Sequence, residues 1–241
     1  MKIIVVIPAY NEAATIRPLA EAVLNQGLDL IVVDDRSQDG TSDQLAELPL
    51  TLIQHQKNCG KAASLRTGID AALESGADGI VTLDGDGQHR PEDIPELITL
   101  FSDNPNSLVI AARLLNREQA PKARRRANDF ADFWISWAAG QRIRDSQSGF
   151  RLYPARAVNQ ILIDHSLKHG FVFESEFLIE AARQGFGFQT VPISSHYPRQ
   201  ARASHFRPVV DITRIVLMVA GRLIRSGFNP VGLARIIWRS T

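Results

Sequence analysis

The sequence predicts an α/β protein with a mostly parallel central sheet. In the first 115 residues, short runs of apolar and β-branched residues alternate with segments of helical composition. This alternation is typical of βαβ units, which build parallel sheets. The runs are nearly continuous in apolar residues, as expected for strands that are buried on both faces. A length of 241 residues and a hydrophobic content of 44% are sufficient for such a domain.

Five strands and four helices are expected in this part of the chain. The strands are predicted at residues 2–8, 29–35, 50–55, 78–84 and 107–113. The helices are predicted at Glu12–Asn25, Thr41–Glu47, Lys61–Ser75 and Glu92–Ser102. Three polar motifs, PAYNE, DDRSQDGT and DGDGQ, directly follow strands. Ligands of open parallel sheets bind at the carboxyl ends of the strands, so these motifs are expected to share one site.

The pattern changes after residue 115. A helix with a basic start and an aromatic continuation is predicted over residues 121–140, followed by a turn-rich segment at 145–154. A helix over 174–184 and a strand over 187–197 come next. In the last long helix, Pro208–Arg225, one narrow stripe contains Asp211, Arg214, Met218, Arg222 and Arg225, and apolar residues cover the rest. Its arginines interrupt the ~20 apolar residues of a membrane span, so it is expected to pack on the body or lie in a membrane interface.

The charges and the cysteine content restrict the setting in which the protein acts. Residues 199–241 contain eight arginines and one acid, which gives +7, whereas the whole chain carries +1 and residues 1–198 therefore −6. Such a tail favours an anionic partner, either phosphate groups, a membrane surface or nucleic acid, although a solvated helix face explains it equally well. Cys59 is the one cysteine, so no internal disulfide is possible and a reducing compartment is expected.

The DGDGQ motif predicts a site for a hard divalent metal ion. Alternate residues of an extended chain point the same way, so Asp84, Asp86 and Gln88 can converge on one point. Carboxylate and amide oxygens suit Mg²⁺ or Mn²⁺. A calcium loop is excluded, because His89 and Pro95 stand where it needs glycine and glutamate. An acidic turn that caps the helix after Pro91 is the structural alternative.

Five segments together resemble, in order and spacing, the family 2 glycosyltransferases. They are VVIPAYNEAATI, IVVDDRSQDGT, NCGKAASLRTG, LDGDGQHRPED and DSQSGFR. The resemblance is greatest to the polyprenyl (dolichyl) phosphate mannosyltransferase-like branch. It implies a GT-A fold, a Rossmann-like three-layer sandwich with a mostly parallel sheet, over residues 1–206. Residues 207–241 would then form basic amphipathic helices that pack on this domain or associate with a membrane surface.

The resemblance also assigns roles to single residues. The implied nucleotide-binding residues are Pro8, Tyr10, Glu12, Asp35, Lys61 and Asp84. Asp84, Asp86 and Gln88 would hold Mg²⁺ or Mn²⁺ and the donor diphosphate, and Asp86 and Asp145 are the candidate catalytic residues. The implied contacts to the acceptor or its phosphate are Arg113, Arg124, Asn128, Arg199, Arg202 and Ser204. Arg202 and His205 stand where the branch has glycine and lysine, which is a departure in the late loop.

The expected activity is inverting, metal-dependent transfer of a sugar from a nucleoside diphosphate, UDP or GDP, to a polyprenyl phosphate or related lipid. Asp145 would deprotonate a hydroxyl acceptor, whereas a phosphate acceptor is already an anion and needs no base. The expected location is cytoplasmic and peripheral at the inner membrane face. A saccharide or other soluble hydroxyl acceptor is the alternative. A nucleic-acid-binding protein is a remote one, because it leaves the acidic motifs unexplained, and no nucleic-acid partner is expected.

Overall fold

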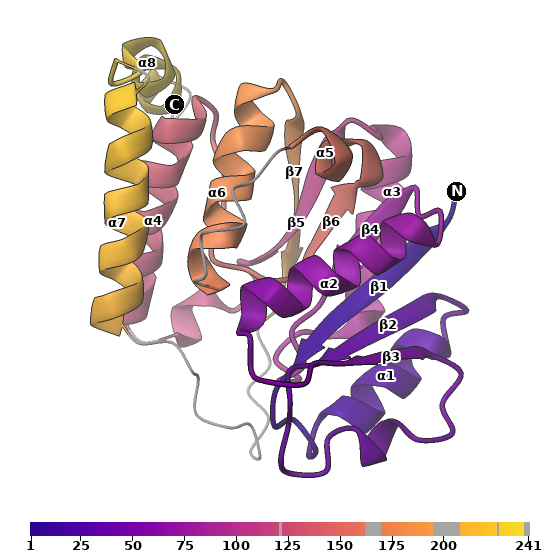
Figure 1. Cartoon of the computed structure of the whole chain (residues 1–241). Coiled ribbons are helices and arrows are strands. Elements are labelled where there is room, and N and C mark those ends of the chain that lie inside the picture. The colour runs from indigo at the N-terminus through magenta and orange to yellow at the C-terminus, as the bar shows by residue number, and fades with distance from the viewer. Residues whose placement is uncertain (121, 162–169, 195–207, 226, 239–241) are drawn as a thin grey trace.

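A seven-stranded sheet forms the centre of the molecule. The computed structural model describes residues 1–120, 122–161, 170–194, 208–225 and 227–238 (Figure 1). The strands are β1 Ile3–Ala9, β2 Asp29–Asp34, β3 Thr51–Gln54, β4 Gly79–Thr82, β5 Ser107–Arg113, β6 Arg151–Pro154 and β7 Gly187–Ile193. They lie in the order β3-β2-β1-β4-β6-β5-β7, and every neighbouring pair is parallel except those of β6, which is antiparallel to β4 and β5. The expected α/β class and mostly parallel sheet are confirmed.

Helices cover both faces of the sheet. The helices are α1 Ile16–Leu24, α2 Lys61–Glu74, α3 Ile94–Asp103, α4 Lys122–Ala139, α5 Ala155–Gln160, α6 Gly170–Arg183, α7 Pro208–Arg225 and α8 Pro230–Trp238. One apolar core lies between the sheet and α1 and α3. A second core joins the other face to α2, α4, α6 and α7. The α7 and α8 helices lie at one flank, beside α4 (Figure 1).

Two of the early helix predictions need correction. Within Thr41–Glu47 only a 3₁₀ turn forms, at Asp43–Leu45. Thr41 instead binds the first loop, because its Oγ1 accepts the Glu12 N–H at 2.8 Å. The helix predicted from Glu12 begins only at Ile16, after a turn in which the Glu12 carbonyl accepts the Thr15 N–H.

The later chain departs from prediction in its lengths and in one strand. The segment at 145–154 turns as expected, but its last four residues form β6, which pairs with both β4 and β5. Such a short run ending in proline carries little strand signal, and its partners decide its conformation. The helix expected from residue 174 begins at Gly170, and β7 ends at Ile193. Among the described residues, no helix is both long and apolar enough to cross a membrane.

Candidate active site

The DGDGQ motif lies against the first loop at the carboxyl end of the sheet. The chain leaves β4 and turns at Gly85 and Asp86 instead of remaining extended. Thr15 Oγ1 donates a hydrogen bond to the Gly85 carbonyl at 2.7 Å. A Cβ on Gly85 would lie 3.2 Å from the Pro8 carbonyl and 3.4 Å from Glu12 Cγ, so glycine permits this close approach. The first and fourth motifs are thus adjacent, as predicted.

Asp84 pairs with a lysine that enters from α2. Lys61 Nζ lies 2.7 Å from Asp84 Oδ1 and 3.2 Å from Glu174 Oε2. Burial would raise the pKa of Asp84, but the Lys61 charge outweighs it and holds this pKa below its usual range. Burial would likewise lower the pKa of Lys61, but the two carboxylates raise it. Lys61 of α2 therefore remains charged and places its ammonium group next to Asp84, which follows β4.

Asp86 and Gln88 are in direct contact. The Gln88 backbone N–H donates to Asp86 Oδ1 at 3.0 Å, and Gln88 Nε2 donates to Asp86 Oδ2 at 2.8 Å. Burial, followed by the negative charge of Asp84, raises the pKa of Asp86. The two carboxylates are consequently close enough to repel one another, although a turn and not an extended chain brings them together.

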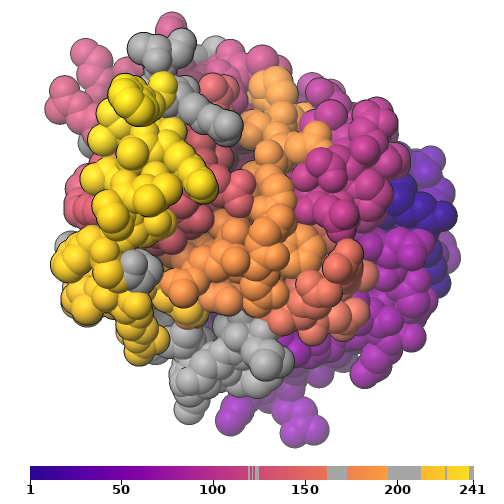
Figure 2. Space-filling model, turned by 90° about the horizontal axis from the view of Figure 1, so that it is seen from above, coloured from indigo at the N-terminus to yellow at the C-terminus, as the bar shows by residue number. Residues whose placement is uncertain are grey.

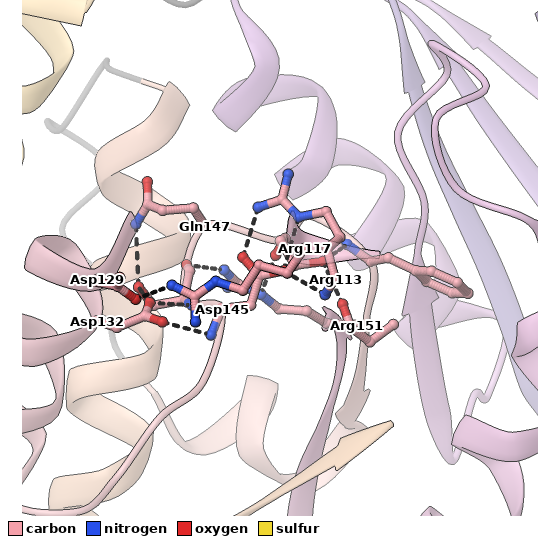
Figure 3. Close-up of polar contacts among 11 residues, drawn as sticks. Arg113, Arg117, Asp129, Asp132, Asp145, Gln147 and Arg151 are labelled. Carbon is pink, nitrogen blue, oxygen red and sulfur yellow. Dashed lines mark hydrogen bonds and ion pairs between the residues drawn. The ribbon is translucent and has the colours of Figure 1, made fainter. Parts of the chain in front are cut away.

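Arg113 and Asp145 form a bidentate ion pair (Figure 3). The charge of Arg113 also acts on Asp84 and Asp86, so the pair lies near the acidic turn. Arg113 Nη2 donates to Asp145 Oδ1 at 2.6 Å, and both Nε and the backbone N–H of Arg113 donate to Oδ2 at 2.8 Å. Burial would raise the pKa of Asp145, but the bonds from Arg113 outweigh it and lower this pKa. Asp132 orients the segment, because its Oδ2 accepts the Asp145 N–H at 2.8 Å.

Asp35 organises the loop that precedes α2. Its side chain is only 4% exposed. Oδ1 accepts the backbone N–H of Cys59 at 2.8 Å and contacts Nδ1 of His55 at 2.7 Å. Oδ2 accepts the N–H of Gly60 at 2.7 Å. Asp35 thus binds the second and third motifs together at the edge of the sheet.

The remaining predicted residues fall into two groups. Tyr10 is half-buried in the first loop, and Asn128 lines a cavity next to Arg113. The side chain of Arg124 and all of Arg199, Arg202 and Ser204 lie outside the described part of the structure, so their expected contacts remain predictions.

Comparison with known proteins identifies the family. The model of glycosyl transferase family 2 matches residues 4–166. The chain belongs to glycosyl transferase family 2. Over 92% of its length the glycosyltransferase is 28% identical to the UDP-N-acetylglucosamine–dolichyl-phosphate N-acetylglucosaminyltransferase of Methanococcus voltae and covers 98% of it. It is 29% identical to the undecaprenyl-phosphate mannosyltransferase of Micrococcus luteus, over 80% of this chain and 83% of that one. The expected resemblance to the polyprenyl-phosphate branch is confirmed.

A solved structure confirms the GT-A fold. The glucosyl-3-phosphoglycerate synthase of Mycobacterium tuberculosis, in complex with Mn²⁺, UDP and glucosyl-3-phosphoglycerate, matches with a TM-score of 0.64 at 19% identity. The match covers 93% of the glycosyltransferase and 79% of the synthase.

The acidic turn of the glycosyltransferase has the donor set of a divalent metal site. Burial, followed by the negative charge of Asp84, raises the pKa of Asp86, so two like charges act on one another at this turn. A divalent cation would relieve that repulsion, and the Gln88 amide adds an oxygen of the kind that Mg²⁺ and Mn²⁺ accept. The residues therefore fit the metal that the sequence predicts.

Three site residues of the glycosyltransferase were missed from the sequence. His89 is 5% exposed, and its Nδ1 has no hydrogen-bond partner. Glu174, the first residue of the helix predicted over 174–184, binds Lys61 and leaves Oε1 unpaired. Arg151 is fully buried and donates to the carbonyls of Ser146 and Glu174 (Figure 3). His89 directly follows DGDGQ and Arg151 ends the DSQSGFR segment, so the sequence offered a signal for both, whereas Glu174 reaches the site only through tertiary packing.

A cavity of about 460 Å³ adjoins the Arg113–Asp145 pair. Its lining includes the arginines Arg113, Arg117, Arg125, Arg142 and Arg144 and the aspartates Asp129, Asp132 and Asp145. Arg117 pairs with Asp129 on α4 (Figure 3). Phe133 of α4 and Ile236 of α8 supply apolar surface. The cavity thus combines a net positive lining with an apolar wall.

Proposed function

We propose that the protein is an inverting, metal-dependent glycosyltransferase that moves a sugar from a nucleoside diphosphate to a polyprenyl phosphate or a related lipid phosphate. The observation that carries the proposal is the contact of the Asp84–Asp86 turn with Lys61 and its position beside the Arg113–Asp145 pair. This arrangement juxtaposes a site for a metal-bound diphosphate with a site for a second anion. The names of the two relatives support a lipid-phosphate acceptor.

The donor would occupy the carboxyl ends of β1, β2 and β4. Pro8, Tyr10 and Glu12 would surround the nucleotide, and Asp35 would contact its base. The lysine cation at residue 61 would attract the diphosphate, in keeping with its raised pKa. Binding of Mn²⁺ and UDP by the solved neighbour supports a donor of this class, with UDP or GDP as the nucleotide.

Asp84, Asp86 and Gln88 would hold Mg²⁺ or Mn²⁺. Such an ion supplies Lewis-acid neutralisation of the leaving diphosphate. Lys61 Nζ lies 2.7 Å from Asp84 Oδ1, so a metal ion on Asp84 would have to displace Lys61 or share the carboxylate with it. Glu174, 3.2 Å from the same ammonium, would retain Lys61 beside the diphosphate during this exchange.

Arg113 would bind the acceptor phosphate, and Asp145 would hold Arg113 in position. A phosphate oxygen is already a nucleophile, so attack on the anomeric carbon from the face opposite to the leaving group needs no base. The lowered pKa of Asp145 and its bidentate bond support this positioning role over the role of a base. The arginine-rich cavity with its apolar wall would accommodate the phosphate and the first part of the lipid.

A membrane surface would present this acceptor to the enzyme. Large apolar side chains are exposed along α7 and α8, namely Val216, Leu217, Ile224, Val231, Ile237 and Trp238. Arg225 and Arg235 are exposed among them. These helices occupy a flank that is remote from the N-terminal strands (Figure 2). Apolar and cationic residues on one surface are typical of peripheral association with an anionic leaflet.

A panel of nucleotides tests the donor and the metal together. UDP, GDP, CDP and ADP are added with and without Mn²⁺, and thermal unfolding is followed. A ligand at about 100 times its Kd stabilises the folded state by about 2.7 kcal/mol, a measurable shift. We expect a Mn²⁺-dependent shift for one base, and loss of that shift and of turnover in Asp86→Ala. Near-normal turnover in this variant would refute the metal assignment.

A soluble hydroxyl acceptor is the second candidate. The product bound to the solved neighbour, glucosyl-3-phosphoglycerate, favours it. Transfer to short-chain polyprenyl phosphate, compared with transfer to phosphoglycerate, distinguishes the two acceptors. A hydroxyl acceptor would also require a base, and turnover would then fall at low pH as the base became protonated.

A further inference from the structure

A second group of side chains with metal-ligand donor atoms lies at the carboxyl ends of β2 and β3. It consists of Asp35 after β2, His55 after β3 and Cys59 in the loop before α2. One donor atom from each lies within 4.8 Å of the other two. Within the described ranges, this is the single cluster of three or more His, Cys, Asp or Glu residues with this property.

The three donors belong to a different chemical class from those of the acidic turn. A thiolate, an imidazole and a carboxylate favour Zn²⁺ and related borderline ions, whereas Mg²⁺ and Mn²⁺ favour oxygen. With zinc bonds of about 2.0 Å to nitrogen and oxygen and about 2.3 Å to sulfur, neighbouring ligands lie roughly 3.5 Å apart. The present spacing therefore needs only small movements. Cys59 is exposed, which leaves a route to solvent for the ion and for a fourth, water ligand.

Supporting hydrogen bonds for such a site are already formed. His55 Nε2 lies 3.0 Å from Thr67 Oγ1, so the ring is held with Nδ1 toward Asp35. The N–H groups of Cys59 and Gly60 fix the Asp35 carboxylate. Metal-binding histidines and carboxylates are usually oriented by partners of this kind.

We propose that Asp35, His55 and Cys59 bind a zinc-class transition-metal ion at a site separate from that of the catalytic Mg²⁺ or Mn²⁺. Binding through His55 Nδ1 replaces its contact with Asp35 Oδ1 and requires the tautomer with the ring proton on Nε2, which donates to Thr67 Oγ1. The Cys59 thiol loses its bond to the Lys57 carbonyl and releases one proton to solvent as the metal–sulfur bond forms.

Occupancy of this site would inhibit the enzyme. This consequence rests on the proposed function, in which Asp35 contacts the donor base. An ion on Asp35 and a base at the same carboxylate exclude one another, so zinc-class ions would compete with the nucleotide while Mn²⁺ would not.

Cobalt(II) tests the site without reference to activity. The full-length protein is titrated with Co²⁺, and the near-ultraviolet absorption of a cobalt–thiolate bond is recorded, with Zn²⁺ then added to displace the cobalt. We expect one thiolate-bound cobalt per chain, which Cys59→Ser abolishes and which Zn²⁺ displaces. Zinc affinity should fall about tenfold or more in Cys59→Ser. Asn58→Ser, an exposed change in the same loop, is the matched control and should leave the absorption intact.

The outcomes separate this proposal from the proposed function. Absence of the thiolate absorption, or equal zinc affinity in Cys59→Ser, overturns the site. A thiolate absorption in a protein that no nucleotide stabilises supports the site and counts against the transferase. Zinc that binds through Cys59 but leaves nucleotide binding unchanged supports the site and overturns the overlap with the donor base.

Discussion

Asp84 lies where three distant segments of the chain meet. Lys61 of α2 binds its Oδ1, Asp86 repels it, and Gly149 packs against it without a side chain. A Cβ on Gly149 would lie 2.6 Å from Asp84 Oδ2, and real Cβ atoms do not approach so closely. The carboxylate is therefore restrained by its neighbours, as the proposed metal site requires.

Gly149→Ala should damage the metal site more than the fold. The added methyl group must displace Asp84 or the 145–150 loop, so we expect Mn²⁺-dependent nucleotide stabilisation to weaken at least about tenfold. The thermal-shift titration described above measures this change. Gly221→Ala is the control, because a Cβ there meets no atom within 4 Å and alanine favours a helix by about 1 kcal/mol. Equal nucleotide affinity in both variants would contradict the role of Gly149.

His89 should make folding stability depend on pH. Burial lowers its pKa from 6.5 to about 4, although Asp84 opposes the shift. Between these values the unfolded chain binds a proton that the folded chain does not, so stability falls as pH decreases from about 6.5 to about 4. The full contribution is about 3 kcal/mol. Urea unfolding at pH 7 and pH 4.5 should show a smaller loss in His89→Gln than in the original protein, and an identical loss would contradict the prediction.

At the scale of the element, α7 packs against the body through apolar residues and through one arginine of its stripe. Ile215, Val219 and Leu223 are buried, whereas Leu217 is 67% exposed. Arg222, predicted on the stripe with Arg214 and Arg225, turns toward α6, and its Nη2 lies 2.5 Å from Glu176 Oε1. The orientation follows from the acids of α6, which the helical projection of α7 alone does not contain.

Arg222→Ala should loosen the docking of α7. Glu176 is buried, and its Oε2 has no partner, so removal of Arg222 leaves an unpaired charge in the interior. Loss of one partner of a buried pair costs about 3 kcal/mol. Chemical denaturation measures the change, and Arg225→Ala, which is exposed, should stay within about 0.5 kcal/mol. Restoration of stability in Arg222→Met/Glu176→Gln would show that the unpaired charge, and not lost packing, is responsible.

The exposed apolar face of α7 should govern vesicle binding. Leu217→Glu/Ile224→Glu adds two negative charges to that face, so flotation with vesicles that contain anionic lipid should fall severalfold. Thr99→Glu/Ser102→Glu places the same two charges on the exposed side of α3 and should float like the original protein. Equal binding of both double variants would disfavour α7 as the membrane contact.

At the scale of the whole molecule, α7 belongs to the same apolar core as α4 and α6. Its three buried residues pack into the cluster that contains Ile135 and Leu178. The cavity beside Arg113 likewise includes Ile236 from α8. The C-terminal helices thus share an apolar core with residues 1–206, although the two parts are predicted to have different functions.

Truncation after residue 206 should therefore lower the stability of the remaining chain. It exposes the apolar surfaces of α4 and α6 that α7 covers, and each buried side chain contributes about 1.5–3 kcal/mol. We expect a denaturation midpoint well below that of the full chain. An unchanged midpoint would instead show that residues 1–206 form an independent unit.

The sequence by itself determined the fold class and the five early strands, and it predicted a metal site in the acidic turn that follows β4. Strand residues such as those of β1 and β4 are locally unambiguous, because an apolar run bounded by turn residues has few other uses. Asp84 and Asp86 could be predicted together as metal ligands because they directly follow such a strand and because carboxylates suit a divalent ion.

Only the tertiary structure decided which side chains complete the site. Glu174 lies 90 residues from Asp84 along the chain and is joined to it through Lys61, and the close approach of Gly149 to Asp84 spans 65 residues. The bond of Asp145 to Arg113, which makes it a support for the arginine, also forms across the fold. Local periodicity reports the face that a segment buries, whereas the partner of a charge depends on the packing of the whole chain.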